Sequence, residues 1–329
     1  MHFHRWKRRE FVTLLGAATA WPLMARAQTT LAALPAIASW KSDAWQSAAA
    51  IAISPNGRFL LTGHWGVVVV WDVEHGRPLT SLPDHQGSIE GIAFLGDARA
   101  VTADSKNEII VWEIPGGRRL ASWVAKTSTL RALAAAPDGR SIATSTDDDH
   151  SVSLWNVATG ALLWSRAEMT GWVTGLAYAP DGKLVVTGQR GSVSLWDAAT
   201  GSLVAQIPTK AQVWATAVSP DSRIAVAAEY DTVSILDLES RSSIGRIEPL
   251  AGPEPFFQHL AFVPGGRHVA VVDVKGATLL AELATKRFVA KAPAASDSPV
   301  RVAISPDGRR AFVGLHNGEI QVLDLTSLG

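Results

Sequence analysis

The chain has 329 residues, of which 47% are hydrophobic and only 18% are charged, and its formal net charge is zero. The absence of cysteine excludes disulfide bonds, thiolate zinc sites, a cysteine nucleophile and a lipidated N-terminal cysteine. The fold must therefore be held together by the burial of apolar surface, without crosslinks of this kind.

Residues 1–27 have the features of an export signal. A basic stretch, Lys7 to Arg9, precedes 14 mostly apolar residues, Phe11 to Met24, and the small residues Ala25 and Ala27 provide a cleavage site. Fourteen helical residues span about 21 Å, which is shorter than the roughly 30 Å hydrocarbon core of a bilayer. We interpret the segment as a signal that is cleaved near Ala27, and not as a membrane anchor.

The string RREFV, from Arg8 to Val12, resembles a twin-arginine export signal. General secretion and an uncleaved cytoplasmic start are the alternatives. Loss of residues 1–27 leaves 25 basic and 29 acidic residues, a net charge of −4 with no cluster of lysine and arginine. Because a nucleic-acid surface needs an excess of positive charge, we expect an exported, periplasmic protein with no nucleic-acid partner and no transmembrane span.

A pattern of 11 residues recurs through the rest of the chain. GSVSLWDAATG, residues 191–201, alternates apolar and polar residues, ends in an aromatic-acidic pair and continues into a Thr-Gly turn. Six relatives of this stretch follow one another at spacings of 40 to 45 residues, which indicates a repeat architecture. Together with Trp196 of the stretch itself, the aligned positions in chain order are Trp71, Trp112, Trp155, Trp196, Leu236, Ala281 and Leu323.

A second element repeats with the same period. Turns of the type Pro-Asp-Gly begin at Pro137, Pro180 and Pro306, and variants stand at Pro55, Pro220 and Pro264. Each lies between two short apolar runs, so it predicts a hairpin connection. One unit is then strand, Pro-Asp-Gly turn, strand, loop, strand ending in Trp-Asp, Thr-Gly turn and strand. Four short antiparallel strands in about forty residues form one blade of a β-propeller.

The SPDG turn, the SVSLWD strand and the ATG turn, in this order and spacing, resemble the repeats of the WD-repeat β-propeller family over residues 38–329. The last three units lack the tryptophan, and most units lack the family's Gly-His pair. Asp149 stands where the family's structural aspartate is expected. The resemblance implies an all-β fold of four-stranded antiparallel blades.

Seven units are present, but the last one ends after its third strand. The segment from Leu34 aligns with the one from Arg118 and places Ala38, Ser39 and Trp40 on a fourth strand. We therefore predict a seven-bladed propeller whose last blade is completed by the N-terminal strand, which closes the ring and removes exposed edges. The expected domains are the signal 1–27, a linker 28–37 and one propeller domain, 38–329.

The aromatic and acidic residues at the strand ends are interpreted as structural. The indoles would fill the space between blades with their N–H on a polar partner. This group consists of Trp71, Asp72, Trp112, Trp155, Trp196, Asp197, Asp237 and Asp324.

No G-x-S-x-G, H-E-x-x-H, P-loop or G-x-G-x-x-G motif in the required context is present, so no catalytic, cofactor or metal residues are assigned. His64 and His316 stand at equivalent positions of neighbouring blades, but two histidines are fewer than a zinc site needs. They are interpreted as exposed or turn-bonded, with a metal site at this face as the alternative.

In the WD-repeat family the loops between the second and third strands and those between blades converge on one face around a central channel. Aromatic and arginine residues, the types that dominate interface hot spots, are frequent in these loops. The candidate binding residues are Trp45, Trp65, Arg131, Trp172, Arg190, Trp214, Tyr230, Phe257, His259 and His316.

These observations favour an exported, monomeric, non-enzymatic β-propeller that serves as an interaction platform for a protein or peptide partner. Two alternatives remain open. One is a small-ligand or carbohydrate binder on the channel face, and the other is a propeller enzyme such as a lactonase or a quinone-dependent dehydrogenase.

Overall fold

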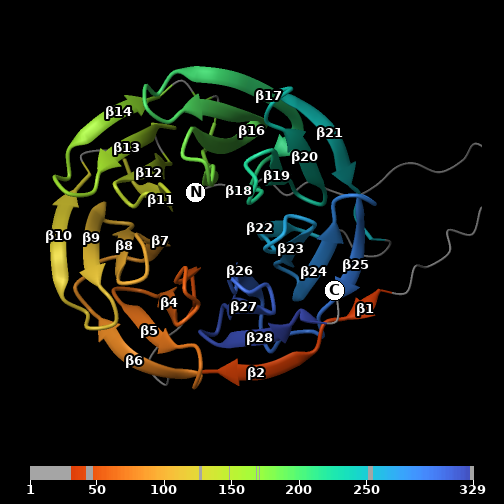
Figure 1. Cartoon of the computed structure of the whole chain (residues 1–329), viewed down its shortest axis with the longest axis horizontal. Coiled ribbons are helices and arrows are strands. Elements are labelled where there is room, and N and C mark those ends of the chain that lie inside the picture. The colour runs from red at the N-terminus through yellow and green to blue at the C-terminus, as the bar shows by residue number, and fades with distance from the viewer. Residues whose placement is uncertain are drawn as a thin grey trace, which may run out of the picture. The chain divides into compact units, whose positions relative to one another are not determined.

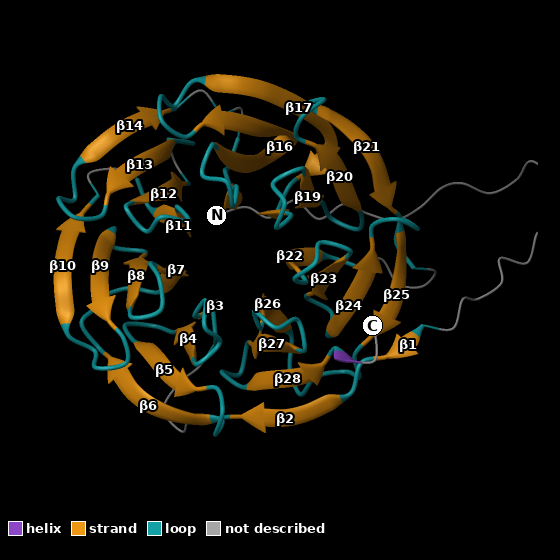
Figure 2. Cartoon of the chain, in the orientation of Figure 1, coloured by secondary structure: helices purple, strands orange, loops and turns teal. Residues whose placement is uncertain are grey.

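The computed structural model describes residues 31–41, 47–125, 128–147, 149–167, 169, 171–250 and 255–326. The expected signal, residues 1–27, lies outside this part of the chain. The described strands form seven sheets around a ring (Figures 1 and 2). The predicted seven-bladed β-propeller is confirmed.

Four blades have the predicted plan of four antiparallel strands, ordered from the channel outward. Blade 1 contains β3 (Ala50–Ile53), β4 (Phe59–Gly63), β5 (Val68–Asp72) and β6 (Arg77–Leu82). Blade 2 contains β7 (Ile89–Phe94), β8 (Arg99–Asp104), β9 (Glu108–Glu113) and β10 (Arg119–Val124). Blade 3 contains β11 (Leu130–Ala135), β12 (Ser141–Thr146), β13 (Val152–Asn156) and β14 (Leu162–Arg166). Blade 5 contains β18 (Ala215–Val218), β19 (Ile224–Ala228), β20 (Val233–Asp237) and β21 (Ser242–Ile247).

Blade 4 differs because one long strand replaces two. It consists of β15 (Gly175–Tyr178), β16 (Leu184–Asp197) and β17 (Leu203–Gln212). The first half of β16 pairs with β15 and its second half pairs with β17. Gly191, with φ at 78°, lies between the halves, and the Trp196 indole N–H reaches the Thr187 hydroxyl across them. The strand therefore reverses its direction at a glycine, which adopts positive φ without steric strain because it has no side chain.

Blades 6 and 7 take in the N-terminal segment. Blade 6 contains β22 (Phe257–Phe262), β23 (His268–Asp273), β24 (Ala277–Glu282) and β25 (Arg287–Lys291), with β1 (Ala32–Ala33) added in parallel to its outer edge. Blade 7 contains β26 (Pro299–Ile304), β27 (Arg310–Leu315), β28 (Ile320–Asp324) and β2 (Ala36–Trp40). Ala38, Ser39 and Trp40 pair antiparallel with β28, which confirms the predicted closure by the N-terminal strand. The segment expected as a linker, 28–37, thus contains β1 and the start of β2.

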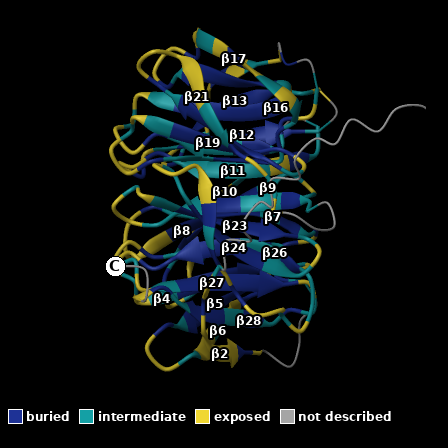
Figure 3. Ribbon diagram, turned by 90° about the vertical axis from the view of Figure 1, so that its right-hand side faces the viewer, coloured by how far each residue is buried: buried dark blue, intermediate teal, exposed yellow. Residues whose placement is uncertain are grey.

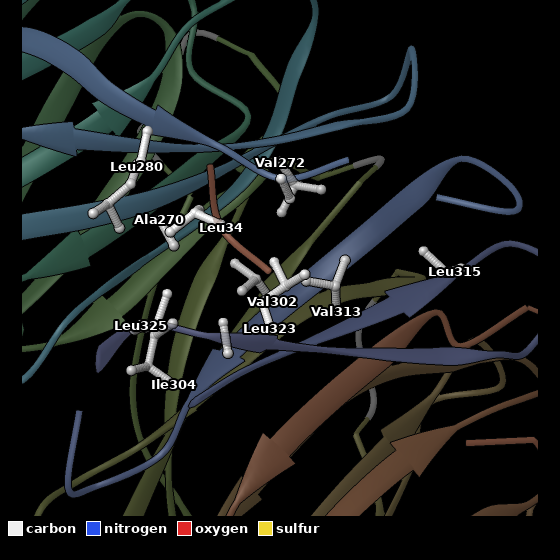
Figure 4. Packing of buried hydrophobic residues seen from close by; sticks show 13 residues of the cluster. Leu34, Ala270, Val272, Leu280, Val302, Ile304, Val313, Leu315, Leu323 and Leu325 are labelled. Carbon is white, nitrogen blue, oxygen red and sulfur yellow. The ribbon is translucent and has the colours of Figure 1, made fainter. Parts of the chain in front are cut away.

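The core consists of apolar clusters that join neighbouring blades. In the cluster of Figure 4, Leu34 from between β1 and β2 packs with Ala270 and Leu280 of blade 6 and with Val302 and Leu323 of blade 7. Each blade has one such interface on either side. Because burial runs around the whole ring, closure stabilises every interface at once.

Buried residues run along the second and third strands of the blades, whereas outer strands such as β2 and β10 and many of the turns are exposed (Figure 3). We call the side with the loops that join successive blades, and the second to the third strands, the loop face. The side with the Pro-Asp-Gly and Thr-Gly turns is the turn face. Among the described residues, no helix is long and apolar enough to cross a membrane.

Candidate functional site

The four strand-end tryptophans lie between blades, with each indole N–H bonded to a threonine of the second strand or, in blade 4, of the first half of β16. Trp112 Nε1 donates to Thr102 Oγ1 at 2.8 Å and Trp196 Nε1 donates to Thr187 Oγ1 at 2.9 Å. The other two pairs are Trp71 with Thr62 and Trp155 with Thr144. The strand on which each tryptophan lies places its ring against the preceding blade of the ring. This arrangement buries both the apolar ring and its single donor, which leaves these indoles no surface for a ligand.

The acids that follow these aromatic positions cap turns. Asp197 Oδ1 accepts the Thr200 backbone N–H and hydroxyl, both at 2.8 Å, and Asp72, Asp237 and Asp324 accept backbone N–H groups in the same way. The side chain of His75 lowers the pKa of Asp72, and the hydrogen bonds of the turns hold the pKa of Asp197, Asp237 and Asp324 below the usual range. The acids stay ionised on the turn face, where they fix the turns.

A second set of acids, which sequence reasoning overlooked, caps the loop face from inside. Asp104 accepts the N–H groups of Gln86 and Gly87, and Asp273 accepts the N–H of Phe256. Glu229 accepts the N–H groups of Lys210 and Ala211. Each acid stands at or just after the end of the second strand of its blade, which is the signal that would have revealed it. Asp149 has a related role in blade 3, where it accepts the Ser128 hydroxyl at 2.8 Å.

Blade 2 contains a buried polar network. His85 Nε2 lies 2.6 Å from Thr102 Oγ1, and its Nδ1 lies 3.1 Å from Asp104 Oδ2. His85, Asp104 and Glu108 form a group whose ligand atoms lie within 4.8 Å of one another. Asp104 nevertheless has its oxygens occupied by four backbone N–H groups, and Glu108 is bonded to Arg119 at 2.6 Å. The hydrogen-bonding pattern is that of a structural network that anchors the loop before blade 2.

The histidines expected to be exposed or turn-bonded have different environments. His64 is buried, with Nε2 2.9 Å from Thr62 Oγ1, whereas His316 is exposed in the loop between β27 and β28. Neither belongs to the group of potential metal ligands found among the described residues.

Three candidate residues are large exposed aromatics in loops of the loop face. The side chains of Trp65, Trp172 and Tyr230 are 71%, 55% and 49% exposed. Arg190 and His316 are also exposed on this side. Trp45 lies outside the described residues. Tryptophan and tyrosine are among the residue types most enriched in binding hot spots.

Tyr230 belongs to an aromatic cluster that also contains Trp214 and Phe256. The ring centroids lie 5.0 Å apart for Trp214 and Phe256, 5.3 Å for Tyr230 and Phe256, and 5.9 Å for Trp214 and Tyr230. Phe256 was not predicted as part of the site, while its neighbour Phe257 was. The expectation for Phe257 was wrong, because it lies in β22 with its side chain fully buried in the core between blades 5 and 6.

Trp214 also lines a cavity in the central channel, together with the candidate residues Arg131 and His259. The cavity has a volume of about 100 Å³ and is walled by the innermost strands of all seven blades. Two further charged residues line it, Glu90 on β7 and Arg301 on β26, and neither was predicted from the sequence. The structure thus separates the candidate residues into exposed residues of the loop face and residues of the channel.

Burial dominates the protonation of the channel residues. It lowers the pKa of His259 to about 3, and the charge of Arg301 acts in the same direction. Burial, with the charge of Arg131 second, lowers the pKa of Arg301 to about 10, whereas burial raises the pKa of Glu90. At neutral pH His259 is therefore neutral while the guanidinium group of Arg301 remains charged.

The closed ring and its loop face define a seven-bladed β-propeller with WD-type repeats. The WD domain, G-beta repeat model matches residues 44–72 and 117–156. A model described as outer membrane protein assembly factor BamB matches residues 148–327, from blade 3 to blade 7. This match covers more than half of the chain, so the chain belongs to that family. No curated protein matches it.

Proposed function

We propose that this protein is an exported, non-enzymatic interaction platform that binds a protein or peptide partner on its loop face. The observation that carries the proposal is the exposure of Trp65 and Trp172 on loops around the channel. An indole provides a large, rigid contact area at a low cost in conformational entropy, which makes it an efficient anchor.

Two further points support this function. The family model is described as an assembly factor for outer membrane proteins, a role that is exercised on other proteins. The loops that carry the indoles are attached to a rigid ring, and loops held by a rigid scaffold are where binding residues concentrate in proteins. The partner would accordingly meet a preorganised surface with little reorganisation.

The export route is part of the proposal. The arginines Arg8 and Arg9 in RREFV, followed by an apolar stretch and small residues near Ala27, support twin-arginine export to the periplasm. A fusion of residues 1–30 to a reporter that functions only when it is exported folded tests this step. The Arg8→Lys/Arg9→Lys fusion should lose export. An equal signal from both fusions contradicts the twin-arginine route.

The partner site is tested with two matched double variants. Trp65→Ala/Trp172→Ala removes the exposed indoles of the loop face, and Leu162→Ala/Leu163→Ala removes two exposed apolar side chains from the outer strand β14. Tagged wild-type and variant proteins are used to capture partners from a cell-envelope fraction, and the affinity of the main partner is then measured with purified components.

We expect the loop-face variant to weaken binding by about 30-fold or more, since a hot-spot residue contributes about 2 kcal/mol or more. The β14 variant should bind like the wild type. Loss of binding only in the β14 variant would move the interface to the outer rim. Turnover of a lactone or an alcohol by the purified protein alone would favour an enzyme instead.

A further inference from the structure

Seven equivalent positions form a ring of residues inside the channel. Each position lies on the innermost strand and is identified by its partner on the second strand of the same blade. Ala50 pairs with Gly63 in blade 1, and Arg301 pairs with Gly314 at the equivalent place in blade 7. All seven line the same cavity. They are Ala50, Gly91, Ala132, Gly175, Ala215, His259 and Arg301.

Five of these positions are alanine or glycine, and the fold requires a small residue at least at Gly91. A Cβ added at Gly91 would lie 2.4 Å from the Cβ of Leu133 on the neighbouring inner strand. The adjacent blades 6 and 7 instead have the large residues His259 and Arg301 at this position. Their strands, β22 and β26, pack together. Since alanine suffices at this position in three blades, packing alone does not explain an arginine and a histidine there.

Arg301 is a half-buried cation with little compensation. Its Nη1 donates to the backbone carbonyl of Val300 at 3.2 Å, and among the described residues it forms no direct ion pair. Arg131 is the second cation in the cavity, and its Nε lies 3.7 Å from Asp147. Glu90 is the one carboxylate among the described residues that line the cavity. Because Arg131 is exposed and has Asp147 beside it, Arg301 is the cation of the lining that has no direct ion pair among the described residues. A charged side chain in a cleft that has no ion-pair partner of its own is a candidate for binding a ligand of opposite charge.

The neutral polar groups of the cavity are mostly donors. His259 Nδ1 accepts the Val302 N–H at 3.3 Å, which places the ring proton on Nε2. The indole N–H of Trp214 and the hydroxyl of Thr216 are buried and have no hydrogen-bond partner among the described residues. Thr216 is 8% exposed and lines the cavity. The cavity therefore offers two guanidinium groups and further donors, against the single carboxylate of Glu90.

We propose that this channel cavity binds the carboxylate group of a small organic acid, with Arg301 and Arg131 as its charge partners. A guanidinium group presents its donors in a plane that matches a carboxylate. The Trp214–Tyr230–Phe256 cluster lies beside the cavity through Trp214 and gives an apolar body a surface on which to stack. The site thus fits an aromatic carboxylate better than a bare anion. This inference does not depend on the partner that binds the loop face.

The test uses the purified full chain and four probes at constant ionic strength: benzoate, acetate, inorganic phosphate and the neutral benzamide. Binding is measured by isothermal titration calorimetry and by the shift in unfolding temperature. We expect benzoate to bind more tightly than acetate and to raise the unfolding temperature, whereas benzamide has no effect. No response to benzoate, or a response to phosphate alone, overturns the proposal.

Two variants in the cavity should change binding in opposite directions. Arg301→Gln should weaken benzoate binding by about tenfold or more, because a charge-assisted hydrogen bond is lost. Glu90→Gln should strengthen it severalfold, because the competing negative charge is removed. The control, Arg287→Gln, changes an exposed arginine on the outer strand β25 and should leave binding unchanged.

Stability separates loss of the site from loss of the fold. The chain with Arg301→Gln should unfold without ligand at the same temperature as the wild type or a higher one, since the substitution removes a half-buried cation that has no direct ion pair among the described residues. If that variant does not fold, Glu90→Gln still decides the matter: equal or weaker benzoate binding in Glu90→Gln contradicts the proposal. Benzoate binding by a folded Arg301→Gln chain at wild-type affinity contradicts it as well.

Discussion

The indole of Trp40 stacks on the indole of Trp71, with ring centroids 6.1 Å apart and ring planes at 24° to each other. Trp40 is on the N-terminal strand β2 of blade 7, and Trp71 is on β5 of blade 1. Trp40 also contacts Phe312 of β27 at 5.4 Å. One side chain therefore joins the N-terminal strand to both blades at the point where the ring closes.

Trp40→Ala should lower the free energy of unfolding by about 3–5 kcal/mol, because it leaves a cavity in the closing interface. Denaturant titration of the purified protein measures this change. Trp172→Ala, at an exposed indole, is the control and should change stability by less than about 0.5 kcal/mol. Equal stability of the Trp40→Ala chain and the wild type would show that the ring closes without this contact.

Trp196→Ala should lower the free energy of unfolding by a similar amount, about 3–5 kcal/mol, through the cavity between blades 3 and 4. Thr187→Val removes only the acceptor of the Trp196 N–H and should cost about 1–3 kcal/mol, since it leaves a buried donor without its partner. Binding on the loop face should stay intact in both variants. A similar cost for the two variants would mean that the hydrogen bond, and not packing, dominates at this position.

Asp104→Asn should destabilise the protein by about 3 kcal/mol at neutral pH, because it breaks the buried pair with His85 and the capping of the loop before blade 2. Hydrogen bonds from His85 and from backbone N–H groups outweigh burial and lower the pKa of Asp104.

A lowered pKa in the folded state means that the contribution of Asp104 is complete above the unfolded pKa of about 3.9 and is lost as the pH falls through the folded pKa. The difference in stability between wild type and Asp104→Asn should therefore shrink below about pH 4. Asp84→Asn, at an exposed position, should show no such trend in denaturant titrations from pH 7 to pH 2. A difference that stays constant over this range would exclude the ionised Asp104 as its source.

His259 should make the protein less stable in mild acid. Its pKa is about 3 in the folded state because of burial, below the value of about 6.5 in an unfolded chain. The unfolded state then binds the proton more readily, so stability is complete above about pH 6.5 and falls as the pH drops toward 3.

His259→Asn keeps a hydrogen-bond acceptor near the Val302 N–H but does not titrate, so it should reduce this loss. His75→Asn, at an exposed histidine, is the control. Thermal unfolding between pH 7 and pH 4 measures the difference, and parallel curves for His259→Asn and wild type would disprove the assignment.

Much of the fold could be predicted from local patterns. The Trp-Asp pairs and the Pro-Asp-Gly turns recur because every blade packs against its neighbours in the same way. The missing fourth strand of blade 7 follows from the count of strands in the last repeat. Asp104, Asp273 and Glu229 were harder to find, because their role depends on the segment that precedes the first strand of the same blade, which for Glu229 is the end of β17. Only the folded sheet shows which N–H groups those acids meet.

The candidate site could be predicted only in part. Trp65, Trp172 and Tyr230 were found because they interrupt the repeat in loops, where exposure is the default. Phe257 is one residue from the exposed cluster, yet the pleat of β22 turns its side chain into the core, because successive residues of a strand point to opposite faces.

The amino-acid sequence by itself determined the number of blades, the strand that closes the ring and the structural character of Trp196 and Asp197, since each depends on spacing that repeats along one chain. Only the tertiary structure decided that Glu90, Arg131, His259 and Arg301 share one cavity, because these residues lie on four different blades. Ring closure brings them together, and burial in the channel then alters the pKa values of Glu90, His259 and Arg301.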